Sequence, residues 1–208
     1  MKIGEIGGTF DPIHNGHLAI AKASLYACQL DEVIFVPAGN PWMKLSTPIS
    51  SSFHRLAMTE RAIQGQKKFF VSTIEVDKAG PSYMVETLEE LQKEKGNNLY
   101  LIIGADSVER FSEWKNPKRI LALSSLIIVS RPQHEFSMLD LKITDNNDNQ
   151  ITTLSDIKIN ISSSEIRNNV FLGKPINDMV PENVEQYIKL KNLYRSDDNE
   201  RSTKRTHS

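Results

Sequence analysis

Short apolar runs alternate with longer amphipathic segments along most of this chain. The apolar runs are rich in Ile, Val, Leu and Phe, and mostly lack the polar residue at alternate positions that marks a half-exposed strand. They therefore predict strands that are buried on both faces of a sheet. We expect these strands at Lys2–Ile6, Glu32–Pro37, Phe69–Val76, Asn98–Gly104, Ser125–Ser130 and Ile151–Leu154.

The segments between the apolar runs predict helices. In Ser82–Lys95, for example, Val85, Leu88 and Leu91 recur at helical spacing and give the segment one apolar face. Strands that alternate with helices of this length predict right-handed βαβ units. We therefore expect an α/β fold, with a single Rossmann-like doubly wound parallel sheet and a C-terminal helical segment. The remaining helices are expected at Gly16–Gln29, Ser51–Gln64, Asn116–Leu123, Ser162–Leu172 and Pro181–Lys191.

Length and composition narrow this picture to an ordinary globular protein. The 208 residues, 39% of them hydrophobic, are enough for one core, and we expect a single domain over residues 1–194. Arg195–Ser208 contains no aliphatic residue and is expected to be a flexible polar tail. The net charge of −1 argues against a dedicated nucleic-acid binder. No run has bilayer-spanning length or a secretory pattern, so we expect a cytoplasmic location with no membrane partner.

Candidate chemistry begins in residues 7–17, with the sequence GGTFDPIHNGH, which directly follow the first predicted strand. The carboxyl edge of a doubly wound sheet is where ligands collect. Gly7 and Gly8 lack a Cβ, so a phosphate or ribose could approach the main chain closely. The amides of Gly8, Thr9 and Phe10 could then donate to ligand oxygens.

His14 and His17 lie three residues apart at the entrance of the following helix, with Asn15 as the expected cap. A helix N-terminus favours an anion, and an imidazole N–H can donate to a phosphate oxygen. The same residues are also compatible with a glycine turn followed by a capped helix that carries two surface histidines. Two histidines without a third ligand make a poor zinc site, so no protein-bound metal is expected.

A second candidate is residues 161–167, with the sequence ISSSEIR. Ser162 followed by Glu165 has the form of a capping box at a helix start. Spare amides, further hydroxyls and Arg167 would also suit a phosphate, although Glu165 adds negative charge to the same turn. The residues alone leave the helix cap and the phosphate site open as alternatives.

Taken together, the two segments resemble the signatures of the H-x-G-H nucleotidyltransferase superfamily. The longer first string resembles the bacterial nicotinate-nucleotide adenylyltransferases, and the resemblance runs from Met1 to about Tyr194. It implies the nucleotidyltransferase fold and transfer of AMP from ATP to nicotinate mononucleotide, which gives nicotinate adenine dinucleotide and pyrophosphate. Mg²⁺ would be carried with the ATP. The expected partners are therefore these small molecules, and oligomeric state is not predicted.

The resemblance also implies roles for individual residues. Arg55–Met58 resembles a helix segment that closes over the site in the family, while Asn169 stands where relatives often carry a second arginine. The catalytic residues would be His14, His17 and Arg167. ATP would contact Gly8, Thr9, Phe10, His14, His17, Lys44, Gly104, Asp106, Ser130, Arg131, Ile161, Ser162, Ser163 and Arg167. Nicotinate mononucleotide would contact Gly7, Thr9, Lys44, Tyr83, Met84, Asp106, Trp114 and Lys115.

Two kinds of alternative remain at this point. A sister adenylyltransferase could use nicotinamide mononucleotide or phosphopantetheine as the acceptor, although the phosphopantetheine enzymes typically have threonine where this chain has His14. A non-catalytic nucleotide sensor could retain the same fold.

Overall fold

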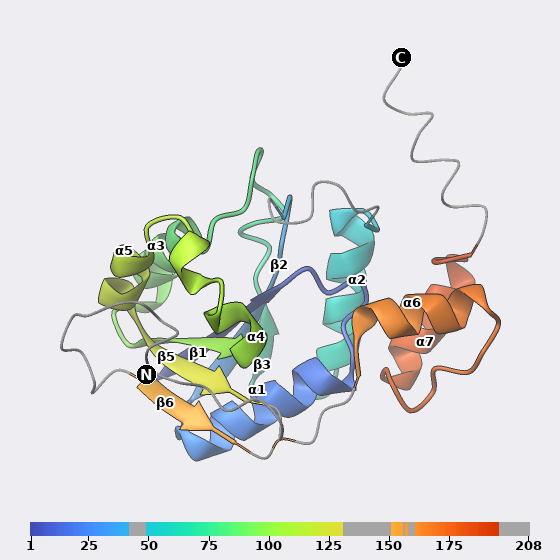
Figure 1. Ribbon diagram of the computed structural model, residues 1–208, viewed down its shortest axis with the longest axis horizontal. Coiled ribbons are helices and arrows are strands. Elements are labelled where there is room, and N and C mark those ends of the chain that lie inside the picture. Colours follow the sequence, from blue (N-terminus) through green and yellow to red (C-terminus); the bar gives the residue numbers. More distant parts are fainter. Residues whose placement is uncertain (42–48, 131–150, 156, 158–160, 196–208) are drawn as a thin grey trace.

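The computed structural model describes residues 1–41, 49–130, 151–155, 157 and 161–195. Its centre is a six-stranded sheet in which every neighbouring pair is parallel, in the order β3-β2-β1-β4-β5-β6 (Figure 1). This order reverses direction between β1 and β4, as in a doubly wound sheet, and confirms the predicted fold class. The strands are β1 (Ile3–Gly8), β2 (Glu32–Pro37), β3 (Phe69–Val71), β4 (Leu99–Gly104), β5 (Ser124–Val129) and β6 (Ile151–Leu154).

Helices cover both faces of the sheet. Helices α1, α2, α6 and α7 contribute to the core on one face, and α3, α4 and α5 to the core on the other, together with the short 3₁₀ turn η2. In Figure 1 the C-terminal helices α6 and α7 lie beside α2 at one end of the molecule. The helices are α1 (Asn15–Ala27), α2 (Ser52–Ile63), α3 (Met84–Lys95), α4 (Ala105–Val108), η2 (Phe111–Glu113), α5 (Pro117–Leu123), α6 (Ser163–Phe171) and α7 (Glu182–Leu190).

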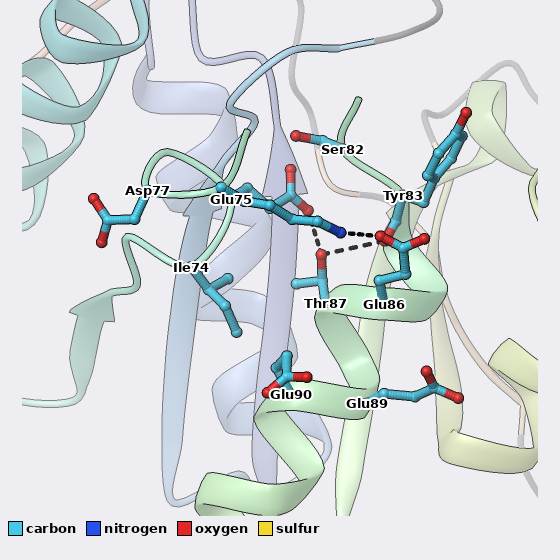
Figure 2. Close-up of a pocket in the computed structure, with 10 residues that line it drawn as sticks. Ile74, Glu75, Asp77, Ser82, Tyr83, Glu86, Thr87, Glu89 and Glu90 are labelled. Carbon is cyan, nitrogen blue, oxygen red and sulfur yellow. Dashed lines mark hydrogen bonds and ion pairs between the residues drawn. The ribbon is translucent and has the colours of Figure 1, made fainter. Parts of the chain in front are cut away.

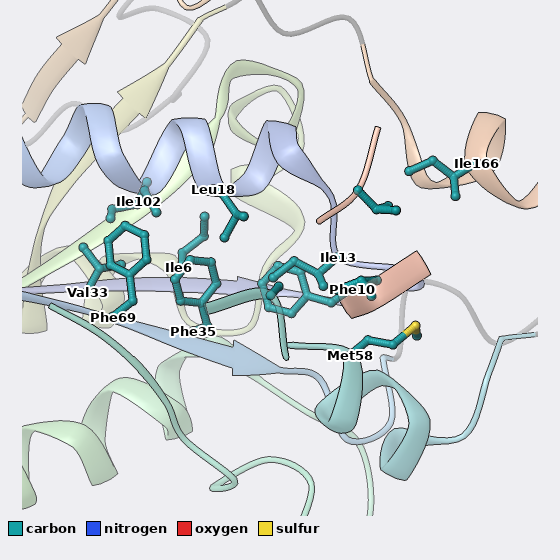
Figure 3. Packing of buried hydrophobic residues seen from close by; sticks show 14 of the residues in the cluster. Ile6, Phe10, Ile13, Leu18, Val33, Phe35, Met58, Phe69, Ile102 and Ile166 are labelled. Atoms are coloured by element: carbon teal, nitrogen blue, oxygen red, sulfur yellow. The ribbon is translucent and has the colours of Figure 1, made fainter. Parts of the chain in front are cut away.

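The strands are apolar at successive positions because each position faces one of two cores. In β2, Val33 and Phe35 pack with α1 and α2, whereas Ile34 and Val36 pack with α3. Successive side chains of a strand point to opposite faces, so burial of both faces requires apolar residues at both. Figure 3 shows the first of these cores, in which Phe10 and Ile13 of the loop after β1 pack beside Phe35.

Two local predictions were wrong. The third strand ends at Val71 and not at Val76, because Thr73 and Asp77 close a turn in which the Thr73 hydroxyl donates to Asp77 Oδ2 at 2.6 Å. Asn15 is not the cap of α1: the N-cap residue is His14, and Asn15 Nδ2 donates to the Asp178 carbonyl at 3.0 Å. The short α4 and η2 were not predicted, since elements of this length show no hydrophobic period.

This topology brings the candidate segments to one edge of the sheet. The loop after β1 and the turn after β4 lie at the carboxyl ends of the two central strands, where the order of the sheet reverses. None of the helices in the described ranges is long and apolar enough to cross a membrane. The boundary at residue 194 and the character of the tail stay predictions, because residues 196–208 lie outside the described ranges.

Candidate active site

The two predicted phosphate segments, residues 7–17 and 161–167, contact each other although they are far apart in the sequence. Ser163 Oγ donates to the Pro12 carbonyl at 2.9 Å, across 151 positions of the chain. Arg167 Nη1 donates to the Asp11 carbonyl at 2.7 Å, and its Nη2 donates to Ser164 Oγ at 3.2 Å. The N-termini of α1 and α6 are thereby fastened to each other. A guanidinium carries more N–H donors than these two bonds use, so Arg167 retains capacity for an anion.

A cavity of about 300 Å³ opens between these two helix starts. A second hollow of about 240 Å³ adjoins it and shares His17, Ser163, Ser164 and Arg167 with its lining. Helix N-termini, imidazoles and a guanidinium around one space favour an anionic ligand. The predicted residues that line the first cavity are His14, His17, Gly104, Asp106, Ser130, Ile161, Ser162, Ser163 and Arg167, and those that line the second include Thr9 and Phe10.

The two histidines form a stacked pair at the start of α1. Their ring centroids lie 3.7 Å apart with an interplanar angle of 24°, and the backbone N–H of His14 donates to Nδ1 of His17 at 3.2 Å. Because Nδ1 accepts this bond, a neutral His17 carries its proton on Nε2. The Phe10 ring contacts His17 edge to face at 5.0 Å. The His17 ring is therefore held from two sides.

The two glycines of the first segment serve packing inside the protein. A Cβ at Gly8 would lie 2.7 Å from the ring of Phe10, whose φ of 49° turns that ring back toward the strand. A Cβ at Gly7 would lie 2.7 Å from the terminal methyl of Met84. Side chains of the protein therefore fill the space that we predicted for close approach of a ligand. At Gly104, by contrast, a Cβ would meet nothing within 4 Å, and this glycine lines the cavity.

Arg55 belongs to the helix segment that the family resemblance placed over the site, but its contacts were not predicted. Its side chain is only 1% exposed, and it donates to the carbonyls of Ser50 (2.9 Å), Thr9 (2.8 Å) and Gly39 (2.9 Å). Burial lowers the pKa of the guanidinium from its ordinary value, while the nearby charge of Asp11 opposes that shift. Arg55 thus ties the loop after β1 to the loop after β2. Arginine in an amphipathic helix usually faces water, so helical periodicity gave no signal for this role.

Five of the residues predicted to bind the nicotinate nucleotide lie around the start of α3: Gly7, Tyr83, Met84, Trp114 and Lys115. Thr9 and Asp106 line the phosphate-facing cavities instead. Tyr83 is the N-cap of this helix and Met84 its first residue, and both pack against the same core cluster as Trp114. The Trp114 ring lies 5.2 Å from that of Phe111. Lys115 Nζ lies 4.1 Å from the centroid of the Tyr83 ring and 2.6 Å from Glu86, so its side chain is engaged at the surface. This leaves the backbone amide of Lys115 as the group that fits the predicted role.

A separate hollow of about 490 Å³ is lined by Tyr83 and by residues of α3 and of the segment after β3 (Figure 2). Its lining includes Glu75, Asp77, Glu86, Glu89 and Glu90, which makes it unsuitable for a phosphate. The Thr87 hydroxyl donates to the carboxylate of Glu75, whose pKa is raised by burial. Within the described part of the chain, no group of three or more His, Cys, Asp or Glu side chains could hold a metal ion.

Four further residues named in the sequence analysis are Ser162, Asn169, Lys44 and Arg131. Ser162 is the N-cap of α6 and accepts from the Glu165 N–H at 3.2 Å, which confirms the cap. Asn169 directs its side-chain nitrogen to Met179 Sδ at 3.5 Å and is not part of the lining of either phosphate-facing cavity. Lys44 and Arg131 lie outside the described residues.

The sheet order, the two fastened helix starts and the histidine pair at the switch point define a nucleotide-binding α/β protein of the nucleotidyltransferase class. Residues 6–169 match the family model described as cytidylyltransferase-like, and the chain belongs to this family. Among its relatives are proteins named "Probable nicotinate-nucleotide adenylyltransferase". That of Leifsonia xyli subsp. xyli is 38% identical over 196 residues, which cover 94% of each chain. That of a Thermoanaerobacter species is 39% identical over 203 residues, which cover 95% of this chain and 96% of the relative.

Solved structures show the same architecture. The nicotinic acid mononucleotide adenylyltransferase of Plasmodium falciparum, complexed with NaAD, superposes with a TM-score of 0.75. The match covers 93% of this chain and 97% of that one at 21% sequence identity, and it supports the fold.

Proposed function

We propose that this protein transfers AMP from ATP to nicotinate mononucleotide, forming nicotinate adenine dinucleotide and releasing pyrophosphate. The observation that carries the proposal is the fastening of α6 to the loop before α1, through Arg167 to Asp11 and Ser163 to Pro12. These contacts build one polar cavity from both phosphate segments. The named relatives, at 38–39% identity over nearly the whole chain, support the same reaction and acceptor.

In the proposed reaction, an oxygen of the 5′-phosphate of nicotinate mononucleotide attacks the α-phosphorus of ATP. A new P–O bond forms, the bond between the α-phosphorus and its bridging oxygen breaks, and pyrophosphate leaves with the electron pair. The attacking phosphate is already a competent nucleophile, so the protein contributes alignment and electrostatic stabilisation. His14 and His17 supply imidazole N–H donors, and the proton on Nε2 of His17 fits this role.

The rest of the cavity would hold the ATP. Arg167, Ser162 and Ser163 would contact the terminal phosphates, and Gly104, Asp106 and Ser130, which line the same cavity, would contact other parts of the nucleotide. Mg²⁺ enters as part of the nucleotide substrate, because this ion commonly keeps its waters and binds phosphate oxygens with few protein ligands. ATP binding by all of these residues is a prediction, as it is for Gly8, Thr9, Phe10, Ile161, Lys44 and Arg131.

The acceptor would occupy the region between the loop after β1 and the start of α3. The amides of Tyr83 and Met84, at the N-terminus of that helix, would receive the nicotinate carboxylate. Trp114 would stack on the pyridine ring, with Lys115 contributing its amide. Gly7, Thr9, Lys44 and Asp106 complete the predicted set, and a cytoplasmic location remains a prediction from the sequence.

The decisive assay measures pyrophosphate release from MgATP with three acceptors in parallel: nicotinate mononucleotide, nicotinamide mononucleotide and phosphopantetheine. We expect the nicotinate compound to give by far the highest kcat/KM. A higher kcat/KM with another acceptor would assign the chain to that sister activity. ATP binding without turnover on any of the three would identify a nucleotide sensor.

A further inference from the structure

Asp11 belongs to the first phosphate segment, has a buried carboxylate and lines the smaller of the two phosphate-facing cavities. Its side chain is 2% exposed and lies in the loop that joins β1 to His14. One carboxylate oxygen accepts the Tyr194 hydroxyl at 2.7 Å, and the other accepts the Ser50 N–H at 3.2 Å. Tyr194 stands 183 positions further along the chain. A residue from the C-terminal end therefore reaches the core of the N-terminal loop.

The same aspartate also receives Arg167, on its carbonyl oxygen at 2.7 Å. Asp11 thus joins its own loop, before α1, to three other parts of the chain: the residue before the cap of α2, the first turns of α6 and the turn after α7. A shift of Asp11 would displace the acceptor that holds Arg167. It would also displace the segment that leads directly into His14.

The backbone after α7 is arranged to deliver the Tyr194 ring to this position. Leu193 is buried in the core that contains α1 and α2, and its N–H closes the end of α7 on the Ile188 carbonyl at 3.0 Å. Tyr194 itself has a φ of +64°, in the left-handed region that non-glycine residues seldom adopt. Such a conformation persists only where surrounding contacts determine it. The hydrogen bond to Asp11 is one such contact.

We propose that Tyr194 is a positioning residue for phosphoryl-group alignment, acting through Asp11 on the His14 loop and on Arg167. Tyr194 is absent from the described linings of both phosphate-facing cavities, so it acts indirectly. Burial and the neighbouring Asp11 raise the pKa of the Tyr194 hydroxyl well above its usual range, and the group therefore remains a donor at neutral pH. This inference rests on the proposed function, since it assigns Tyr194 to the same site.

The test compares Tyr194→Phe with Tyr187→Phe in the full chain. Tyr187 is buried, whereas Tyr194 is partly buried, and both carry a bonded hydroxyl. The Tyr187 hydroxyl lies 2.9 Å from His54 Nδ1, and this bond joins α7 to α2 and not to Asp11. We expect Tyr194→Phe to lower kcat by about 10-fold or more, because small errors in alignment are costly. Binding of MgATP should also weaken, because Arg167 is held through Asp11, while KM for nicotinate mononucleotide should change little. Tyr187→Phe should keep the kcat of the unsubstituted protein. Its Tm should fall by about as much as the Tm of Tyr194→Phe, because each variant loses one hydrogen-bonded hydroxyl. Equal kcat in the two variants overturns the proposal.

A double-substitution cycle with Asp11→Asn tests the route of the effect. The amide oxygen of asparagine can still accept a hydrogen bond but carries no charge. If Tyr194 acts through Asp11, the kcat of the double variant should be little lower than that of the less active single variant. Losses that multiply independently overturn the proposal.

A failure of the proposed function gives a different result from a failure of the positioning role. It shows as an absence of turnover by the unsubstituted protein with nicotinate mononucleotide. The comparison of Tyr194→Phe with Tyr187→Phe is then made on the Kd for MgATP, where we expect weaker binding in the Tyr194 variant alone. Equal Kd values in the two variants again overturn the positioning role.

Discussion

The backbone N–H of His14 donates to Nδ1 of His17 while the two rings stack 3.7 Å apart. This one hydrogen bond does two things at the start of α1. It satisfies a backbone donor that would otherwise lack a helical partner, and it directs the proton of a neutral His17 ring to Nε2. The capping role and the proposed phosphate-donor role of His17 therefore use different nitrogens and can be separated by substitution.

We expect His17→Ala to lower kcat by about 10²-fold or more, the scale for removal of one preorganised donor to transition-state charge. The measurement is pyrophosphate release at saturating MgATP and nicotinate mononucleotide. His17→Asn is the informative companion, because its side-chain oxygen can accept the His14 N–H but its shorter amide does not reach the position of Nε2. It should retain the thermal stability of the unsubstituted protein and still lose kcat. A His17→Asn variant with normal turnover would contradict the donor role.

Arg167 should not be replaceable by lysine. A single ammonium group lacks the planar fork that bonds both the Asp11 carbonyl and Ser164. Loss of one charge-assisted hydrogen bond costs about 1.5–3 kcal/mol, so we expect kcat/KM for ATP to fall by roughly 10- to 100-fold in Arg167→Lys. Steady-state kinetics with ATP varied measures this.

Arg119→Lys is the matched control for that substitution. Arg119 is half exposed on α5 and pairs with Glu89 at 3.1 Å, away from the two cavities. We expect its kinetics to be those of the unsubstituted protein. If both variants lose activity equally, the effect belongs to arginine loss in general and not to the phosphate site.

Trp114 should distinguish the two substrates. An aromatic stack contributes about 0.5–1.5 kcal/mol beyond area burial, so Trp114→Ala should raise KM for nicotinate mononucleotide up to roughly 10-fold. KM for ATP should change little. Because the Trp114 ring also packs on Phe111, Trp114→Phe serves as the control that keeps a flat ring and most of the packing. A parallel rise of both KM values in Trp114→Ala would contradict the stacking role.

The sequence predicted the features that depend on local periodicity and on chain order. Apolar runs such as Val33–Val36 coincide with a strand of the structure, since a strand buried on both faces is usually apolar at successive positions. The adjacency of residues 7–17 and 161–167 followed from their resemblance to one family's signatures, and the bond between Ser163 and Pro12 shows it directly. These features need only the order of residues along the chain.

Features that depend on distant side chains were beyond that reasoning. The hydrogen bond between Tyr194 and Asp11 joins residues 183 positions apart, and neither residue's identity or sequence neighbourhood predicts this contact. Arg55 looks like any polar position of an amphipathic helix until three carbonyls are seen around its guanidinium. The missing Cβ of Gly8 predicted space for a ligand, but the Phe10 ring fills that space. The position of this ring depends on a backbone turn that no periodicity encodes. Tertiary geometry decides each of these cases.

Glu5 provides a last prediction, on the pH dependence of stability. This carboxyl group on the central strand is 0% exposed, and neither of its oxygens has a hydrogen-bond partner among the described residues. Burial, and secondarily the charge of Glu75, raise its pKa well above the ordinary value of 4.5. As the pH rises above 4.5, the unfolded chain releases this proton while the folded protein retains it. Folding then takes up a proton, so the free energy of unfolding falls until the pH reaches the folded-state pKa.

Glu5→Gln removes the titration and should reduce this downward slope, leaving the smaller contribution of Glu75, whose pKa is also raised by burial. Glu5→Leu also removes the buried polar group, and we expect it to be the more stable variant near pH 8 by about 1–3 kcal/mol. Urea unfolding between pH 5 and pH 8 measures both effects. Glu90→Gln, at an exposed position paired with Lys93, is the control and should leave the slope unchanged. A slope that persists in full in both Glu5 variants would show that the carboxyl group is not a source of the pH dependence.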